Sequence, residues 1–198
     1  MTAEFVPSEV ARLLVVDDDP ILREFAQAKL ATPKISVQVA ENGEEGLRRL
    51  TAGGFDIALV DLDMPVMDGF ELIRSVRADN RLKHIPIIVA TSRDDTAAID
   101  GAYAAGATSF VLKPLNWRVV SHQLAYVLRG SREAARIRAK ARTLRNALRA
   151  QDEVLSICQG RIDDVLRLML DEPLSPDLFA RVWEQLHSLS GDIRDKST

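Results

Sequence analysis

Three consecutive aspartates, Asp17 to Asp19, stand at the end of a short aliphatic run and are followed at once by Pro20. Asp19 has a structural explanation, because an aspartate N-cap before a proline at the first helical position is a common helix start. Asp17 and Asp18 are then left over, and two adjacent carboxylates repel unless one takes a proton or a cation lies between them. Mg2+ prefers carboxylate and water oxygens. The pair therefore indicates either a magnesium site or a solvated acidic turn.

Three further polar residues stand at the ends of other aliphatic runs. Asp61 ends the run "IALVD", Thr91 ends "IIVAT", and Lys113 follows "FVL". If each run is a strand of one parallel sheet, these side chains gather with the aspartate pair at the carboxyl edge of that sheet. Each residue alone could be a strand end or a solvated tip, but random placement would rarely give the whole set.

The elements that must position this set alternate along the first two thirds of the chain. Each aliphatic run is followed by a helix-patterned segment, which is the order of βαβ units and predicts a parallel sheet. The fold class predicted is α/β, a five-stranded doubly wound parallel sheet followed by an all-α coiled-coil or helical-hairpin extension. The predicted strands are 12–16, 36–40, 56–60, 86–90 and 109–112, and the helices start near Pro20, Gly43, Gly69, Thr96 and Asn116.

The motifs "VVDDDP", "LVDLDMPVMDGFEL", "VATS" and "FVLKP" occur in this order, and together they resemble the CheY-like receiver domain of two-component response regulators. The resemblance covers residues 10–129 as a receiver domain. It implies a phosphorelay protein that is phosphorylated on an aspartate by a sensor histidine kinase or a phosphotransfer protein. It also implies a signalling phospho-acceptor and not an enzyme, with only self-catalysed phosphoryl transfer and slow autodephosphorylation.

The resemblance assigns a role to each residue of the acidic set. Asp61 matches the phospho-acceptor, a carboxylate nucleophile that forms an acyl phosphate. Asp17 and Asp18 match the acidic pair that holds Mg2+, together with Asp61 and the backbone carbonyl of Asp63. Mg2+ and Lys113 would then supply positive charge around the phosphoryl oxygens.

A second group matches the residues that respond to phosphorylation. Thr91 matches the hydroxyl that bonds a phosphoryl oxygen, and Phe110 matches the aromatic that turns inward when Thr91 moves. Pro114 matches a site of a cis peptide bond, which is plausible only before proline. Gly69 is expected to supply a left-handed turn before the third helix.

The last third, residues 130–198, carries an uninterrupted alternation of three- and four-residue gaps that predicts a coiled-coil seam. We expect a long helix over about 131–170, a break at 171–176 and a short helix over about 177–190. The seam predicts a homodimer through these C-terminal helices, with Gln151 as its one polar member. The seam residues are Ala134, Ile137, Ala141, Leu144, Leu148, Gln151, Leu155, Cys158, Ile162, Val165 and Met169.

Two other functions stay open. "QLHSLSG" faintly resembles the "HxLKG" pattern of histidine phosphotransfer domains, which would make His187 a phosphohistidine in a phosphotransfer intermediate, although Ser190 replaces the lysine. Residues 129–149 hold eight bases and one acid, so a DNA-binding regulator is the third possibility. Nucleic acid is the less favoured partner, because no reading helix follows the basic segment.

The composition limits the cellular compartment and the kinds of partner that we expect. The formal net charge of -3 gives no global field toward nucleic acid or membrane, and the single cysteine excludes a disulfide framework. The N-terminus lacks the pattern of a signal peptide, and no apolar stretch is long enough to span a bilayer. We therefore expect a cytoplasmic protein.

Overall fold

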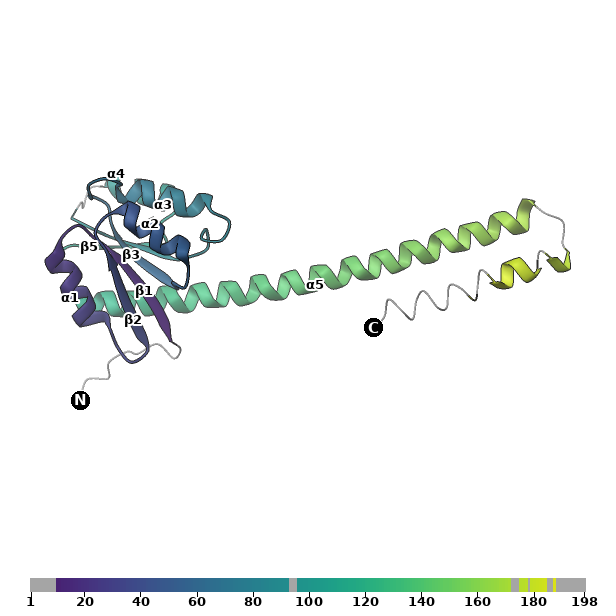
Figure 1. Ribbon diagram of the computed structural model, residues 1–198, viewed down its shortest axis with the longest axis horizontal. Coiled ribbons are helices and arrows are strands. Elements are labelled where there is room, and N and C mark those ends of the chain that lie inside the picture. The colour runs from purple at the N-terminus through teal and green to yellow at the C-terminus, as the bar shows by residue number, and fades with distance from the viewer. Residues whose placement is uncertain (1–9, 93–95, 172–174, 178, 185–186, 188–198) are drawn as a thin grey trace. The chain divides into compact units, whose positions relative to one another are not determined.

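The computed structural model divides the chain into two compact units, Met1–Ala135 and Arg136–Thr198, and each is described by itself. Figure 1 shows the elements of both units. The residues that the structure describes are 10–92, 96–171, 175–177, 179–184 and 187.

The first unit is built on a five-stranded, wholly parallel sheet with the strand order β2-β1-β3-β4-β5. Because β2 lies on one side of β1 and β3 on the other, the crevice typical of such sheets opens outside the carboxyl ends of β1 and β3. The strands are β1 Ala11–Val16, β2 Ile35–Ala40, β3 Ile57–Asp61, β4 Ile87–Thr91 and β5 Ser109–Leu112.

Helices cover both faces of this sheet. One hydrophobic core joins it to α2, α3 and α4, and a second joins its other face to α1 and the start of α5. In Figure 1, α2, α3 and α4 lie above the sheet and α1 lies at its left. The helices are α1 Pro20–Leu30, α2 Gly43–Ala52, α3 Gly69–Ala78, α4 Thr96–Ala105 and α5 Trp117–Asp171.

Strand β1 shows why the aliphatic runs are continuous. Leu14 and Val16 lie in the core shared with α2 to α4, whereas Leu13 and Val15 lie in the core shared with α1 and α5. A strand covered on both faces needs apolar residues at every position. The predicted fold class is confirmed, and most strand bounds differ from the predicted ones by a single residue.

The helix start after the aspartate run is confirmed in detail. Asp19 is the N-cap of α1, its side chain accepts a hydrogen bond from the backbone N–H of Ile21 at 2.8 Å, and Pro20 is the first helical residue. The third aspartate is therefore used by the helix. Asp17 and Asp18 remain available for other chemistry.

The expectation for Gly69 is wrong. Among the described residues, the left-handed backbone positions are Val66, Gly53, Gly54 and Gly106, and Gly69 is not one of them. A Cβ at Gly69 would instead collide with the backbone carbonyl oxygen of Asp61 and the Cα of Leu62. Glycine is needed there so that the first turn of α3 can pack directly on the end of β3.

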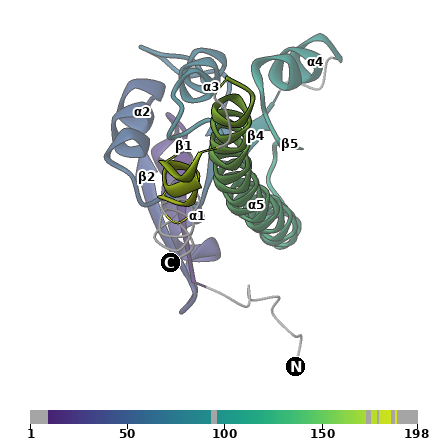
Figure 2. The same cartoon turned by 90° about the vertical axis from the view of Figure 1, so that its right-hand side faces the viewer.

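The long helix α5 runs without interruption from Trp117 to Asp171, through Gly130 and Gly160 (Figure 2, seen along its axis). After it, helical residues are described at 176–177, 179–184 and 187. Half of the predicted break, residues 172–174, and the end of the predicted short helix, residues 188–190, lie outside the described residues. Within the part of the chain that the structure describes, no helix is long and apolar enough to cross a membrane.

Candidate metal centre

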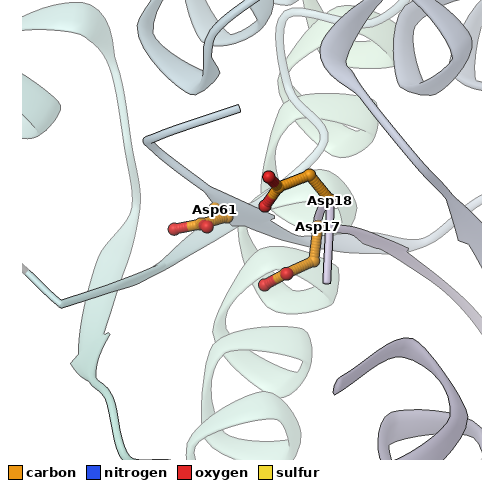
Figure 3. A group of neighbouring side chains, drawn as sticks. All are labelled: Asp17, Asp18 and Asp61. Atoms are coloured by element: carbon orange, nitrogen blue, oxygen red, sulfur yellow. The ribbon is translucent and has the colours of Figure 1, made fainter. Parts of the chain in front are cut away.

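The aspartate pair and Asp61 meet because β1 and β3 are neighbours in register. Val16 lies beside Val60, so the residues that follow each strand emerge at the same edge of the sheet. One carboxylate oxygen from each of Asp17, Asp18 and Asp61 lies within 4.8 Å of the others. Figure 3 shows these three side chains as neighbours from the ends of two strands.

Two of the three carboxylates are buried, and backbone amides hold both in place. Asp17 is 1% exposed and Asp61 5% exposed, whereas Asp18 is exposed. Asp17 Oδ1 accepts a hydrogen bond from the N–H of Asp19 at 3.0 Å, and Asp61 Oδ1 accepts one from the N–H of Leu62 at 2.8 Å. Their remaining oxygens face the shared pocket.

Lys113 supplies the positive charge of the pocket. Its Nζ lies 2.8 Å from Asp17 Oδ2 and 2.8 Å from Asp61 Oδ2. The backbone fixes the position of the lysine, because its N–H donates to the carbonyl of Thr91 at 2.9 Å. The peptide bond between Lys113 and Pro114 is cis, as the resemblance implied.

The pKa values of this ion pair reflect its burial. Burial raises the pKa of the Asp61 carboxyl above its ordinary value, and the repulsion by Asp17 adds to this, while the hydrogen bond and charge of Lys113 oppose it. Burial acts to lower the pKa of Lys113, but its hydrogen bonds to Asp17 and Asp61 prevail, so this pKa is raised. Lys113 is thus held as a cation beside a carboxylate whose charge is only partly compensated.

The donor set fits a hard divalent cation. Three carboxylates and one ammonium leave a formal charge of -2 in a small pocket, and Mg2+ takes one or two carboxylates plus waters and phosphate oxygens. Asp18 is exposed, so the pocket opens to solvent on its side. A bound cation could therefore keep several waters.

Thr91 lies on β4, the strand next to β3, and Phe110 lies on β5, the strand beyond β4. Thr91 is the last residue of β4 and is 1% exposed. Phe110, on β5, is half-buried against the core that includes α3 and α4. Its ring meets Tyr103 of α4 edge to face, with centroids 6.0 Å apart. Phe110 therefore packs where a small displacement would also move α4.

Two other predicted site residues, Asp63 and His187, have exposed side chains. Asp63 lies two residues beyond β3, and its side chain is exposed. His187 belongs to the second unit, is exposed, and has its ring 5.0 Å from that of Trp183. Most of the motif around His187 lies outside the described residues.

Sequence reasoning missed Arg23. Its guanidinium donates from Nη1 to the backbone carbonyl of Asp17 at 2.7 Å, which ties the first turn of α1 to the end of β1. The missed signal is weak, because an arginine in the first turn of a helix is usually a solvated residue. The hydrogen bond helps to fix the backbone that carries the aspartate pair.

The sheet order and the pocket together define a small doubly wound α/β protein with an acidic, lysine-bridged site at its topological switch point. The family model for the response regulator receiver domain matches residues 13–125. The chain belongs to this family.

Individual relatives agree with this assignment. Chemotaxis protein CheY1 of Helicobacter pylori is 36% identical over 119 residues, which are 59% of this chain and 96% of the relative. The solved structure of chemotaxis protein CheY4 of Vibrio cholerae has a TM-score of 0.57 and 31% identity, over 60% of this chain and 98% of that one. Response regulator TrrA of Thermotoga maritima was solved in complex with Mg(2+)-BeF. Its structure has a TM-score of 0.53 and 29% identity, and the match covers 60% of this chain and 99% of TrrA.

Proposed function

We propose that this protein is a two-component response regulator in which Asp61 accepts a phosphoryl group and thereby switches a surface for protein interaction. The observation that carries the proposal is the contact of Lys113 Nζ with both Asp17 and Asp61, at 2.8 Å each, within a cluster of three carboxylates. Phosphoryl transfer depends mainly on positioning and on neutralising charge, and this pocket is built for both.

The proposed reaction is a displacement at phosphorus. A carboxylate oxygen of Asp61 attacks the phosphorus of a phosphohistidine on a kinase or phosphotransfer partner. The new P–O bond forms as the P–N bond breaks, and the histidine nitrogen keeps the electron pair. Lys113 is placed to pair with an oxygen of the transferred group. Slow attack by water on the acyl phosphate would reset the protein, so it acts as a signalling acceptor and not as an enzyme with turnover.

Asp17, Asp18 and Asp61 would hold Mg2+, and the backbone carbonyl of Asp63 would add a fourth protein ligand. When bound, the ion supplies positive charge to the phosphoryl oxygens and aligns the donor. The net charge of -2 left by three carboxylates and Lys113 supports this assignment. The similarity to TrrA, which was solved with Mg(2+)-BeF, supports it independently.

The proposed switch uses Thr91 and Phe110. Drawing the hydroxyl of Thr91 toward the phosphoryl group would vacate space beside β4, and the half-buried ring of Phe110 could turn into it. Because that ring packs edge to face on Tyr103, its turn would change the contact with α4. The side chain of Tyr103 is 47% exposed, so the change would alter the surface of α4, where a downstream protein could bind.

We further propose that the protein is cytoplasmic, as the proposed kinase partners require, and that it forms a homodimer through α5. The large apolar side chains of Ile137, Leu144 and Leu148 are 53 to 64% exposed in one chain. Such a row of exposed apolar residues marks an interaction surface. We expect the receiver unit to signal through protein contacts and not through DNA.

The test is incubation with acetyl phosphate and Mg2+, followed by intact-mass measurement. The wild type should gain the mass of one phosphoryl group, and Asp61→Asn should gain none. Glu24→Gln removes an exposed carboxylate from α1 and serves as the matched control that should still be labelled. Labelling of Asp61→Asn to the same extent as the wild type, or no labelling of the wild type, would overturn the proposal.

A further inference from the structure

One stretch of α5 lies wholly in solvent within a single chain. All 18 residues from 136 to 153 are exposed, over about five helical turns. Isolated helices of this length are marginal in water, and most helices are stabilised by packing an apolar face. Its large apolar residues all fall on the heptad seam, at Ile137, Leu144 and Leu148. This seam needs a cover along its length.

Gln151, the polar residue of the seam, indicates the orientation of the helix that pairs with α5. In heptad notation Gln151 occupies a d position, as do Ile137, Leu144, Cys158 and Val165. The amide of Gln151 carries two donors and an acceptor, so burying it in the seam requires a polar partner in the same layer.

In an antiparallel pair, d positions face a positions. All a positions of this seam are apolar, so Gln151 would always lie opposite an aliphatic side chain. In a parallel pair shifted by one or two heptads, it would face another d residue, and no other d residue carries an amide. A parallel pair without a shift puts Gln151 opposite Gln151 of a second copy. The a positions are Ala134, Ala141, Leu148, Leu155, Ile162 and Met169.

From this we infer that α5 pairs with α5 of a second copy of this chain as a parallel, unshifted coiled coil, in which the two Gln151 amides hydrogen-bond to each other. The inference rests on the homodimer of the proposed function and adds its orientation and register. It also predicts a salt response. Parallel pairing brings together two basic segments, residues 129–149, each with eight bases and one acid. Because salt screens their repulsion, added salt should strengthen the dimer.

The test places single cysteines in the full chain carrying Cys158→Ala, which keeps that seam position small and apolar. Leu144→Cys lies on the seam, and Arg142→Cys is the matched control on the outer face of the same turn. With oxidised glutathione, Leu144→Cys should form covalent dimers roughly tenfold faster than Arg142→Cys. Mixing Leu144→Cys with Leu155→Cys reports antiparallel pairing in the register that places these two residues in one layer. Mixing Leu144→Cys with Ile137→Cys reports a parallel shift of one heptad and leaves Gln151 in both chains. Neither mixture should give a cross-linked heterodimer.

Sedimentation separates the possible failures. A Cys158→Ala protein that stays monomeric at high micromolar concentration would overturn the homodimer and its orientation together. A dimer in which Leu144→Cys does not cross-link, or in which a mixed pair does, would overturn the orientation or register alone. In Gln151→Leu, which makes every layer apolar, the dimer should tighten while the mixed cross-links appear. Unchanged exclusion of those cross-links would show that Gln151 does not set the register.

Discussion

At the scale of single residues, the pocket is a balance between burial and charge. Asp17 and Asp61 are almost wholly buried, and carboxylates are costly to bury unless they are paired. The single positive charge of Lys113 compensates only one of the two negative charges of Asp17 and Asp61. The pocket is therefore organised for a further cation at the expense of the stability of the protein without one.

Replacing Asp61 with asparagine should stabilise the protein in the absence of Mg2+. Because burial raises the pKa of Asp61, the folded state binds more protons than the unfolded state between the ordinary carboxyl pKa and the raised one. Wild-type stability therefore falls as the pH rises through this window. At neutral pH the variant should therefore have a higher free energy of unfolding than the wild type. Urea unfolding measures this difference.

The pH and metal dependence of the same variant provide the control. Below the ordinary carboxyl pKa, Asp61 is protonated in both states, so the advantage of Asp61→Asn should vanish there. If Mg2+ binds the folded wild type as proposed, it should raise the midpoint of unfolding of the wild type more than that of the variant. An asparagine variant less stable than the wild type at neutral pH would contradict this account.

At the scale of elements, glycines fulfil opposite requirements in two helices. Gly69, at the start of α3, has no room for a Cβ because the backbone of Asp61 and Leu62 lies against it. Gly130 and Gly160, within α5, have nothing within 4 Å of an added Cβ. Glycine is thus required by close packing in α3, whereas in α5 it only lowers the intrinsic stability of the helix.

Alanine substitution should separate these two roles. Gly69→Ala should lower the free energy of unfolding by about 3 kcal/mol or more, because the clash is with backbone that cannot turn aside. Gly130→Ala should raise it by about 0.5–1 kcal/mol through helix propensity alone. Thermal and urea unfolding, followed by circular dichroism, measure both. Equal effects of the two substitutions would refute the distinction.

Arg77 connects three elements of the first unit. From α3 it donates to the carbonyl of Ile85, before β4, and to that of Gly106, after α4, both at 2.8 Å. Arg77→Ala should lower the free energy of unfolding by about 2 kcal/mol, because both carbonyls lose a charged donor. Urea unfolding is again the measurement.

Arg74→Ala is the matched control for Arg77, because Arg74 lies on the same helix with its side chain exposed. Its effect should stay within about 0.5 kcal/mol. If both arginine variants lose the same stability, helix propensity or net charge would explain the loss, and the two carbonyl contacts would not.

At the scale of the whole molecule, the two units differ in what holds them. The first has two hydrophobic cores of its own, and Arg132 of α5 closes it by donating to the carbonyl of Val10 at 2.6 Å. A chain ending at Ala135 should therefore stay folded and accept a phosphoryl group from acetyl phosphate. It should be monomeric in sedimentation, because it lacks most of the seam. A truncated chain that remains dimeric would place the dimer contact in the receiver unit.

The sequence predicted those features that a repeated pattern of residues marks, and it did not predict those that depend on spatial neighbours. The sheet and the cluster of Asp17, Asp61 and Lys113 were predictable, because apolar runs covered on both faces end at one edge. The hydrogen bond from Arg23 was not, since nothing in a helical arginine indicates which carbonyl it reaches. The role of Gly69 was misread because a missing side chain can serve a turn or a close contact, and only the spatial neighbours distinguish the two.

The double contact of Lys113 has a consequence for how the protein comes into being. An ammonium already seated between Asp17 and Asp61 lets a newly made chain close its sheet before any divalent ion arrives. Biogenesis would then be insensitive to fluctuations in the cellular magnesium supply, and chelators would silence the molecule without denaturing it.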